Sequence, residues 1–402
     1  MSTDDQHDKK RATRLVHNAY TPPAGFGGLN TAVHHASTVT FENVAAMRSR
    51  NWKHDTGYTY GLHGTPTTFT LAKRIAELEG GREAVLAPSG LAAIMLVDFA
   101  LLVAGDEMLL PDNVYNPSRE LATTMLADFG VTTRFYDPMR GAAIGALIND
   151  RTRLVWIETP GSVTMEMPDV AAIAAAAKTK NVLTAIDNTW AGGLLFCPFD
   201  HGVDIVMHAL TKYPSGSSDV LMGSVTTRDE SLHSRIKTAH MRLGLGIGGD
   251  DAYLMLRSLA TLELRLAQSG ATALALAQWL AARPEVARVL HPAFEESPGH
   301  AIWKRDFSGA SGLFSVVLEK QIAETRVDAM VDSLKLFRIG YSWGGVHSLA
   351  VPYRVGSVGS AGGPPRTAAP WPALGTLVRF YAGLEHPDDL IADLEQAFKC
   401  LG

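Results

Sequence analysis

Short apolar runs alternate with longer helical patterns between about residues 70 and 230. Each run is apolar at nearly every position, which indicates strands that are covered on both faces, as in parallel sheets. Of the segments between them, Asp169 to Lys180 begins with an acidic residue and ends in lysines, as a helix dipole favours. This alternation predicts an α/β domain with a mostly parallel sheet. The predicted strands are Ala84–Ala87, Met108–Leu110, Arg134–Tyr136, Leu154–Ile157, Val182–Ile186, Ile205–Met207 and Ser224–Thr227.

The pattern changes after Asp251. A long helical pattern rich in Leu and Ala covers Ala252 to Arg283, and strand-like segments follow at Gly312 to Leu318 and at Leu374 to Tyr381. A last helical pattern spans Pro387 to Cys400. These elements predict a second, smaller α+β domain.

Two further segments lack periodicity. The first sixty or so residues are interrupted by Pro, Gly and Asn, so we expect an arm that packs on something else. The stretch from Val355 to Pro372 is rich in Gly, Pro and Ser and is predicted to be a surface loop. The predicted organisation is an arm over 1–65, a large α/β domain over 66–255 and a small C-terminal α+β domain over 256–402.

Composition excludes several classes of protein. The chain has 402 residues, of which 46% are hydrophobic and 19% charged, within the range of globular proteins. Its 36 basic and 41 acidic residues give a net charge of −5, with no basic block beyond Lys9-Lys10-Arg11. We therefore expect no nucleic-acid partner.

Membrane and export signals are also missing from the sequence. The longest apolar stretch, Leu91 to Ala104, contains Asp98 and is shorter than the roughly 18 residues of a membrane span. Met1 to Arg14 lacks the apolar region of a signal peptide. The two cysteines, Cys197 and Cys400, match neither a disulfide framework nor a metal-ligand spacing. We expect a cytoplasmic protein with no metal site and no membrane partner.

Two short motifs suggest other chemistries. Gly244–Gly249 has the GxGxxG spacing, but it follows the helical Ser231–Arg242 rather than a strand, so a loop is the better interpretation. Gly340–Gly344 fits GxSxG, which would make Ser342 the nucleophile of a serine hydrolase. That mechanism needs an acid and then a histidine downstream, and only about sixty residues remain. It is kept as the alternative from a different class.

A third constellation lies at predicted strand ends. Lys212 follows the strand Ile205–Met207, and Asp187 follows Val182–Ile186. Ser89-Gly90-Leu91 joins another strand to a helix, where free backbone N–H groups can hold a phosphate. Ligands of open α/β sheets bind at the carboxyl ends of the strands. A lysine, a carboxylate and an anion cradle are together what pyridoxal 5'-phosphate requires.

The chain resembles the Cys/Met-metabolism family of pyridoxal-phosphate-dependent enzymes, and within it the bacterial carbon–sulfur β-lyases. The resemblance runs from about Thr13 to the last helix, and five segments carry it in the family's order. These segments are Tyr60–Thr67, Glu158–Ser162, Asp187–Trp190, Thr211–Tyr213 and Tyr341–Gly345.

The resemblance implies an aspartate-aminotransferase-type fold (fold type I) and a homotetramer of two active dimers. It implies the β-elimination of L-cystathionine to homocysteine, pyruvate and ammonia in methionine biosynthesis, with L-cysteine desulfhydration as a further activity. The residues alone do not separate this reaction from those of sister enzymes. A cystathionine γ-lyase, a methionine γ-lyase or an O-acyl-homoserine sulfhydrylase stays open as the alternative.

The resemblance also implies roles for single residues. Lys212 is the Schiff-base lysine, which later moves the α-proton. Asp187 pairs with the pyridine nitrogen and keeps it protonated. Tyr115 stacks on the cofactor ring, contacts the substrate and takes part in proton transfer. Arg379 holds the substrate carboxylate through two parallel donors, with a structural ion pair as its alternative interpretation.

The remaining roles concern the phosphate and the substrate pocket. Ser89, Gly90, Leu91 and Thr211 are expected to hold the phosphate, and Tyr60 to reach it from the neighbouring subunit. Ser342 and Trp343 are expected to line the substrate side of the pocket. The chain has Leu62 where the family commonly carries an arginine on the neighbour's phosphate, and we hypothesise that His63 partly substitutes for it.

Overall fold

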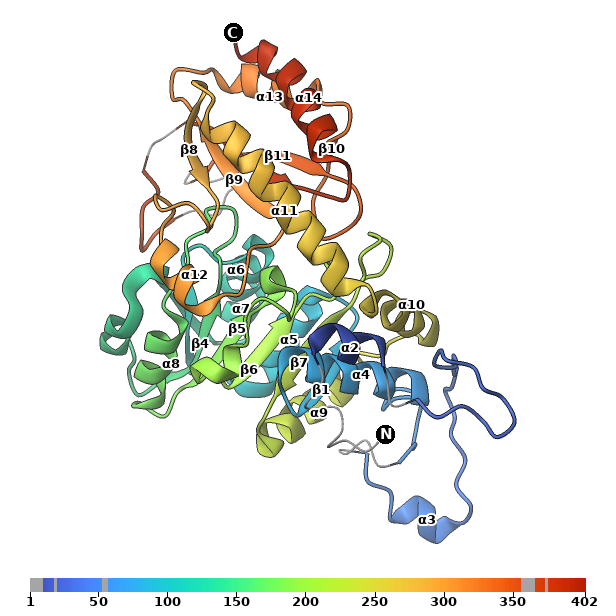
Figure 1. Cartoon of the computed structure of the whole chain (residues 1–402). Helices are drawn as coiled ribbons and strands as arrows, with labels where there is room; N and C mark the ends of the chain where they lie inside the picture. Colours follow the sequence, from blue (N-terminus) through green and yellow to red (C-terminus); the bar gives the residue numbers. More distant parts are fainter. Residues whose placement is uncertain (1–9, 18–19, 53–56, 356–365, 373–374) are drawn as a thin grey trace.

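The structure is a computed structural model that describes residues 10–17, 20–52, 57–355, 366–372 and 375–402. Within these ranges the strands form a seven-stranded sheet of order β1-β7-β6-β5-β4-β2-β3 and a five-stranded sheet of order β10-β11-β12-β9-β8. Figure 1 shows the two sheets stacked along the long axis of the molecule, with the C-terminus at the far end of the smaller one.

All seven strands predicted for the large sheet are present. They are β1 (Glu83–Ala87), β2 (Glu107–Pro111), β3 (Thr132–Tyr136), β4 (Thr152–Glu158), β5 (Leu183–Asp187), β6 (Ile205–His208) and β7 (Gly223–Thr227). β3, β2, β4, β5 and β6 are mutually parallel, and β7 runs antiparallel to both β1 and β6. The predicted mostly parallel α/β sheet is therefore confirmed.

Helices on both faces explain why these strands are apolar throughout. Within β4, Leu154 and Trp156 belong to a hydrophobic cluster with α5 (Gly90–Leu101) and α9 (Glu230–Leu243). The alternate residues Val155 and Ile157 belong to another cluster, with α8 (Val170–Lys178). Because successive side chains point to opposite faces, a strand between two helical layers must be apolar at every position.

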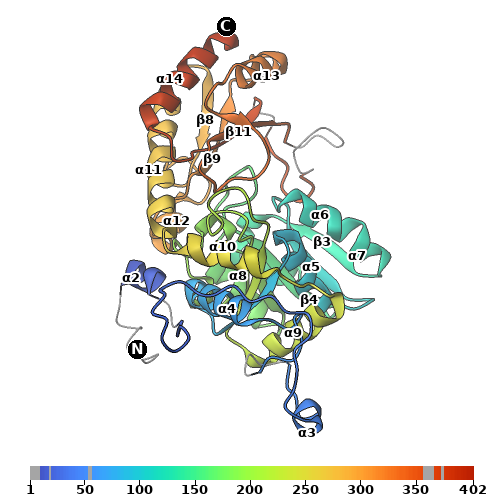
Figure 2. The same cartoon turned by 90° about the vertical axis from the view of Figure 1, so that its right-hand side faces the viewer.

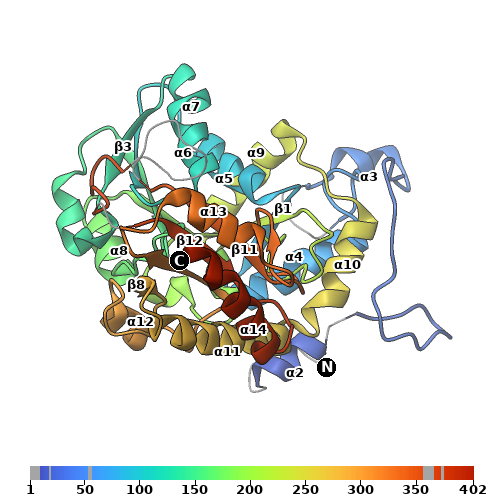
Figure 3. The ribbon, with the colours of Figure 1, turned by 90° about the horizontal axis from the view of Figure 1, so that it is seen from above.

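The smaller sheet carries its helices on an outer face. Figures 2 and 3 show α11 and α14 side by side along it, with α13 beside them. Its strands are β8 (Val286–Leu290), β9 (Leu313–Leu318), β10 (Arg338–Ile339), β11 (Leu349–Tyr353) and β12 (Leu377–Tyr381). The helices on this face are α11 (Leu262–Ala281), α13 (Glu324–Asp332) and α14 (Pro387–Phe398). α12 (His300–Asp306) lies instead near α8 of the larger sheet, where Arg305 forms an ion pair with Asp169 (Figure 1).

The long helical pattern after Asp251 is two helices rather than one. α10 (Gly249–Leu259) ends before α11 begins at Leu262. The predicted domain boundary at 255/256 falls inside α10, and the three-part division stays a proposal. Of the predicted loop from Val355 to Pro372, residues 356–365 lie outside the described residues, as does the first residue of the predicted strand Leu374–Tyr381.

The N-terminal segment reaches away from the body of the chain (Figure 1). Figure 1 shows the chain around α3 (Val44–Arg48) as an extended excursion, while α2 (Arg11–Val16) lies near α4 (Pro66–Glu79). On this segment Phe26 is 66% exposed and Leu29 is 89% exposed. Whether this arm packs on another chain stays a prediction. None of the helices in the described ranges is long and apolar enough to cross a membrane.

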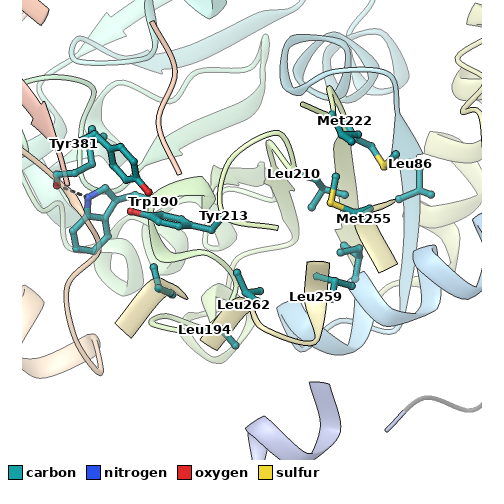
Figure 4. Close-up of a cluster of buried hydrophobic side chains, with 14 of the residues drawn as sticks. Leu86, Trp190, Leu194, Leu210, Tyr213, Met222, Met255, Leu259, Leu262 and Tyr381 are labelled. Atoms are coloured by element: carbon teal, nitrogen blue, oxygen red, sulfur yellow. Dashed lines mark hydrogen bonds between the residues drawn. The ribbon is translucent and has the colours of Figure 1, made fainter. Parts of the chain in front are cut away.

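One hydrophobic cluster joins the two sheets. It holds Leu71 of α4, Met255 of α10 and Val317 of β9, and Figure 4 shows part of it, with Trp190, Tyr213 and Tyr381 at one end. The Gly312 amide donates to the Tyr213 hydroxyl at 2.8 Å, and the Trp190 indole donates to the Leu313 carbonyl at 3.0 Å. The start of β9 is thus fixed against the segments that follow β5 and β6.

Replacing Tyr213 with phenylalanine leaves the buried Gly312 amide without its acceptor. An unpaired buried donor costs about 1–3 kcal/mol, so we expect Tyr213→Phe to lower the midpoint of thermal unfolding in differential scanning calorimetry. Tyr58→Phe, at a residue that is 49% exposed, is the control and should unfold at the parent midpoint. Equal midpoints for Tyr213→Phe and the parent would contradict this role.

Candidate active site

A cavity of about 590 Å³ lies where the carboxyl ends of β4, β5 and β6 meet residues of the smaller sheet. Every predicted site residue except Tyr60 lines it. These are Ser89, Gly90, Leu91, Tyr115, Asp187, Thr211, Lys212, Ser342, Trp343 and Arg379. The structure therefore brings together residues that are up to 290 positions apart in the chain, between Ser89 and Arg379.

Lys212 is the cavity's amine. Its Nζ donates a hydrogen bond to the Ser342 hydroxyl at 3.0 Å and lies 5.5 Å from the centre of the Trp343 ring. Partial burial and the positive charge of Arg379 lower the pKa of Lys212 to about 8, against the opposing effect of Asp187. A lysine with this pKa is neutral in a useful fraction near neutral pH, so it can act as a nucleophile and as a base.

Asp187 is the last residue of β5 and lines the cavity. One of its carboxylate oxygens, Oδ1, accepts a hydrogen bond from the Thr189 amide at 2.9 Å. Burial raises the pKa of Asp187, while the hydrogen bonds from Thr189 and the nearby His208 and Lys212 oppose the increase. A cationic group held against this carboxylate would keep it ionised.

Glu158 is a site residue to which the sequence analysis assigned no role. It ends β4 opposite Asp187 in the strand register, and its Oε2 accepts from the Tyr115 amide at 2.7 Å. Burial and the Asp187 charge raise the pKa of Glu158 well above its usual value. The rule that selected Asp187, a polar residue at the carboxyl end of a strand, would also have selected Glu158 after Leu154–Ile157.

Tyr115 stands at the start of α6 (Asn116–Thr123), held through its backbone by Glu158. Burial and the negative charges of Asp187 and Glu158 raise the pKa of the Tyr115 phenol. The phenol is therefore protonated near neutral pH and can act as a hydrogen-bond donor toward the cavity.

Arg379 lies on β12, and its guanidinium lines the cavity. Among the described residues no carboxylate forms an ion pair with it, and its buried Nη2 has no hydrogen-bond partner. Desolvation lowers the pKa of its guanidinium. The alternative of a structural ion pair is therefore not seen in this part of the chain. A half-buried guanidinium whose Nη2 is buried without a partner fits a carboxylate that arrives with a ligand.

The N-terminus of α5 forms the anion end of the cavity. The Ser89 hydroxyl caps the helix by accepting from the Ala92 amide at 3.0 Å, and the first helical amides have no acceptor within the helix. A Cβ on Gly90 would lie 2.6 Å from the Ala209 Cβ, so only glycine lets the helix start this close. The Thr211 hydroxyl donates its only proton to the Met222 carbonyl, with 3.1 Å between the two oxygens. Thr211 can therefore donate to a phosphate only if it gives up this hydrogen bond.

Tyr60 does not line this cavity. It is 47% exposed and meets the His63 ring edge-on. Its role in a neighbouring subunit stays a prediction. The His63 imidazole is hydrogen-bonded to the Thr59 hydroxyl, and burial together with Lys237 and Arg50 lowers its pKa. His63 is therefore mostly neutral near pH 7, which is unfavourable for the hypothesised phosphate contact.

The two competing motifs form other structures. Gly244 ends α9 in the left-handed conformation, and Gly249 begins α10, so the GxGxxG segment joins two helices. Ser342 has a φ of 82° but accepts its hydrogen bond from Lys212, and no helix follows it. A Cβ on Gly344 would lie 2.6 Å from the Lys212 backbone, which explains the glycine of this turn. The elbow of a serine hydrolase requires a strand, this turn and then a helix.

A lysine with a lowered pKa beside a carboxylate, an anion cradle and a guanidinium without an ion-pair partner in the described residues define the site of a pyridoxal-phosphate-dependent enzyme that acts on amino acids. The residues fit the cofactor on structural grounds. The cradle at Gly90 is open to an anion, Asp187 can accept from a ring nitrogen, and Lys212 can bond to a carbonyl carbon.

The comparisons with known proteins agree with this class. The chain belongs to the family of Cys/Met metabolism PLP-dependent enzymes, whose family model matches residues 12–399. The predicted family and cofactor are confirmed.

Curated relatives and a solved structure cover almost the whole chain. A putative cystathionine beta-lyase of Rhizobium johnstonii is 45% identical over 96% of this chain and 95% of its own length. Cystathionine beta-lyase MetC of Escherichia coli is 39% identical over 97% of this chain and 98% of its own. The crystal structure of metB from Corynebacterium glutamicum matches with a TM-score of 0.89 and 30% identity, covering 99% of this chain and 100% of that one. The predicted aspartate-aminotransferase-type fold is confirmed.

The lowered pKa of Lys212 can be measured from the pH dependence of a reaction rate. Only the neutral amine attacks a carbonyl, so the rate at which cofactor-free protein combines with pyridoxal phosphate should rise with pH about a midpoint near 8 instead of 10.5. Arg379→Met removes a nearby positive charge and should raise this midpoint. Nα-acetyl-lysine, whose side-chain amine is free in solution, is the reference amine. A midpoint above 10 for the parent protein would contradict the assigned environment.

Proposed function

We propose that this protein is a carbon–sulfur lyase that converts L-cystathionine and water to homocysteine, pyruvate and ammonia through β-elimination, with L-cysteine as a further substrate. The observation that carries the proposal is the joint presence of Lys212 and Arg379 in one cavity. The first can move a proton, and the second can hold the carboxylate next to the carbon that loses it. The names of the two curated relatives support the choice of substrate.

In this proposal the chain's own residues bind and orient the amino acid. Arg379 holds the α-carboxylate through paired N–H donors, which fixes the α-carbon near Lys212. Lys212 removes the α-proton as a neutral amine, and the Ser342 hydroxyl orients that amine. When bound, pyridoxal phosphate supplies the electron sink that stabilises the charge left on the α-carbon.

The remaining site residues would hold the cofactor and contact the departing sulfur. Asp187 would accept a hydrogen bond from the ring nitrogen, and the amides at Ser89, Gly90 and Leu91 would hold the phosphate, with Thr211 beside them. The Tyr115 phenol would pack against the cofactor, and because its raised pKa keeps it protonated, it would donate a hydrogen bond to the departing sulfur. Trp343 closes the substrate side.

Assembly and location belong to the same proposal. A homotetramer of active dimers would cover the exposed arm residues Phe26 and Leu29, and it would let Tyr60 reach a neighbouring phosphate. A cytoplasmic location agrees with the free thiols of Cys197 and Cys400. The division into an arm over 1–65, a large domain over 66–255 and a small domain over 256–402 is supported by the two sheets.

The products formed from L-cystathionine test the function directly. The purified, cofactor-loaded protein should give pyruvate with homocysteine in mass spectrometry. Lys212→Ala, which lacks the base, is the control and should give neither product at a comparable rate. Formation of 2-oxobutyrate with cysteine would assign a sister enzyme of the family, and absence of turnover would reject the substrate.

A further inference from the structure

The guanidinium of Arg379 is supported by an aromatic ring from the next strand. In the register of the small sheet, Arg379 lies opposite Val351 of β11 and opposite Ser315 of β9. Tyr353 is two positions beyond Val351 on the same face, which makes it the diagonal neighbour of Arg379. The centre of its ring lies 5.2 Å from the Arg379 Cζ, within the range of a cation–π interaction.

This support differs from the usual way of stabilising a poorly solvated arginine. A buried guanidinium is normally paired with a carboxylate, and such a pair would occupy the donors that a ligand needs. In the described part of the chain Arg379 has no such pair, and its Nη2 is buried without an acceptor. A ring face attracts the cation without accepting a conventional hydrogen bond, so the N–H groups stay available.

Tyr353 is placed to act on the cavity and not only on the core. It is 6% exposed, yet it is among the residues that line the cavity, and the Arg379 charge counters the effect of burial on the pKa of its phenol. The ring is therefore held rigidly beside the carboxylate-binding group.

We propose that Tyr353 is a positioning residue whose ring holds Arg379 unpaired in the cavity and thereby sets the affinity of the site for a carboxylate. This inference rests on the carboxylate-binding role of Arg379 in the proposed function. In this inference the Tyr353 ring stabilises the Arg379 charge in place of a carboxylate, and the phenolic hydroxyl is not needed.

Two probes that react with the bound cofactor isolate this effect. Aminooxyacetate carries a carboxylate and methoxyamine does not, and both change the absorbance of the cofactor without any elimination. The parent protein should react faster with aminooxyacetate. Tyr353→Leu should reduce that preference about 3- to 30-fold, the range expected for a partly desolvated cation–π contact, with little change in the methoxyamine rate.

Matched variants separate the ring from general packing. Tyr353→Phe keeps the ring and should retain the preference. Phe199→Leu removes a ring 5.1 Å from the Arg228 Cζ, at a residue that does not line the cavity, and should also retain it. Tyr353→Met also lacks the ring, but its longer and more flexible side chain fills an irregular space better, so it takes the place of Tyr353→Leu if the leucine variant does not fold.

The outcomes decide between the explanations. An unchanged preference in a folded Tyr353→Leu or Tyr353→Met protein would overturn the proposal, and so would an equal loss of both rates. A loss in Tyr353→Phe as large as that in Tyr353→Leu would assign the effect to the hydroxyl and reject the ring. Because neither probe needs lyase activity, failure of the proposed elimination would leave this test intact.

Discussion

The cavity brings Lys212, Arg379 and Asp187 together, and in the described residues no carboxylate forms an ion pair with Arg379. The chemistry of the site depends on this arrangement of charges. Desolvation and the positive charge of Arg379 lower the pKa of Lys212, and the negative charge of Asp187 opposes that decrease. Removing each of these charges from water costs free energy. The site is therefore suited to ligands that bring anionic groups to the arginine and to the helix N-terminus, and a cationic ring nitrogen to the aspartate.

The fold produces this arrangement through the direction of its strands. Since β4, β5 and β6 are parallel, their carboxyl ends lie at one edge of the sheet. Glu158 and Asp187 end two of these strands, and Lys212 follows the third. The smaller sheet then closes the edge with Arg379 and the Ser342 turn. Tyr213, next to Lys212, accepts from the Gly312 amide at the start of β9, so the two halves of the site are tied by a buried hydrogen bond.

Much of this could be predicted from local patterns in the sequence. Runs such as Leu154–Ile157 are apolar at every position because both faces are covered, so the strands were identified and the polar residues after them pointed to the site. Arg379 has no such local signal within its apolar strand, and the family resemblance identified it. Tyr353 escaped detection because its importance depends on the register between β11 and β12, which the sequence does not display. The break between α10 and α11 was missed because Leu and Ala continue through it.

The central claim is that these groups form one pyridoxal-phosphate site around Lys212. The most direct measurement is borohydride reduction of the cofactor-loaded protein, followed by digestion and mass mapping of the labelled peptide. The account expects loss of the visible absorbance band and a reduced cofactor attached to Lys212. A label on another lysine such as Lys237, or no label at all, would contradict it.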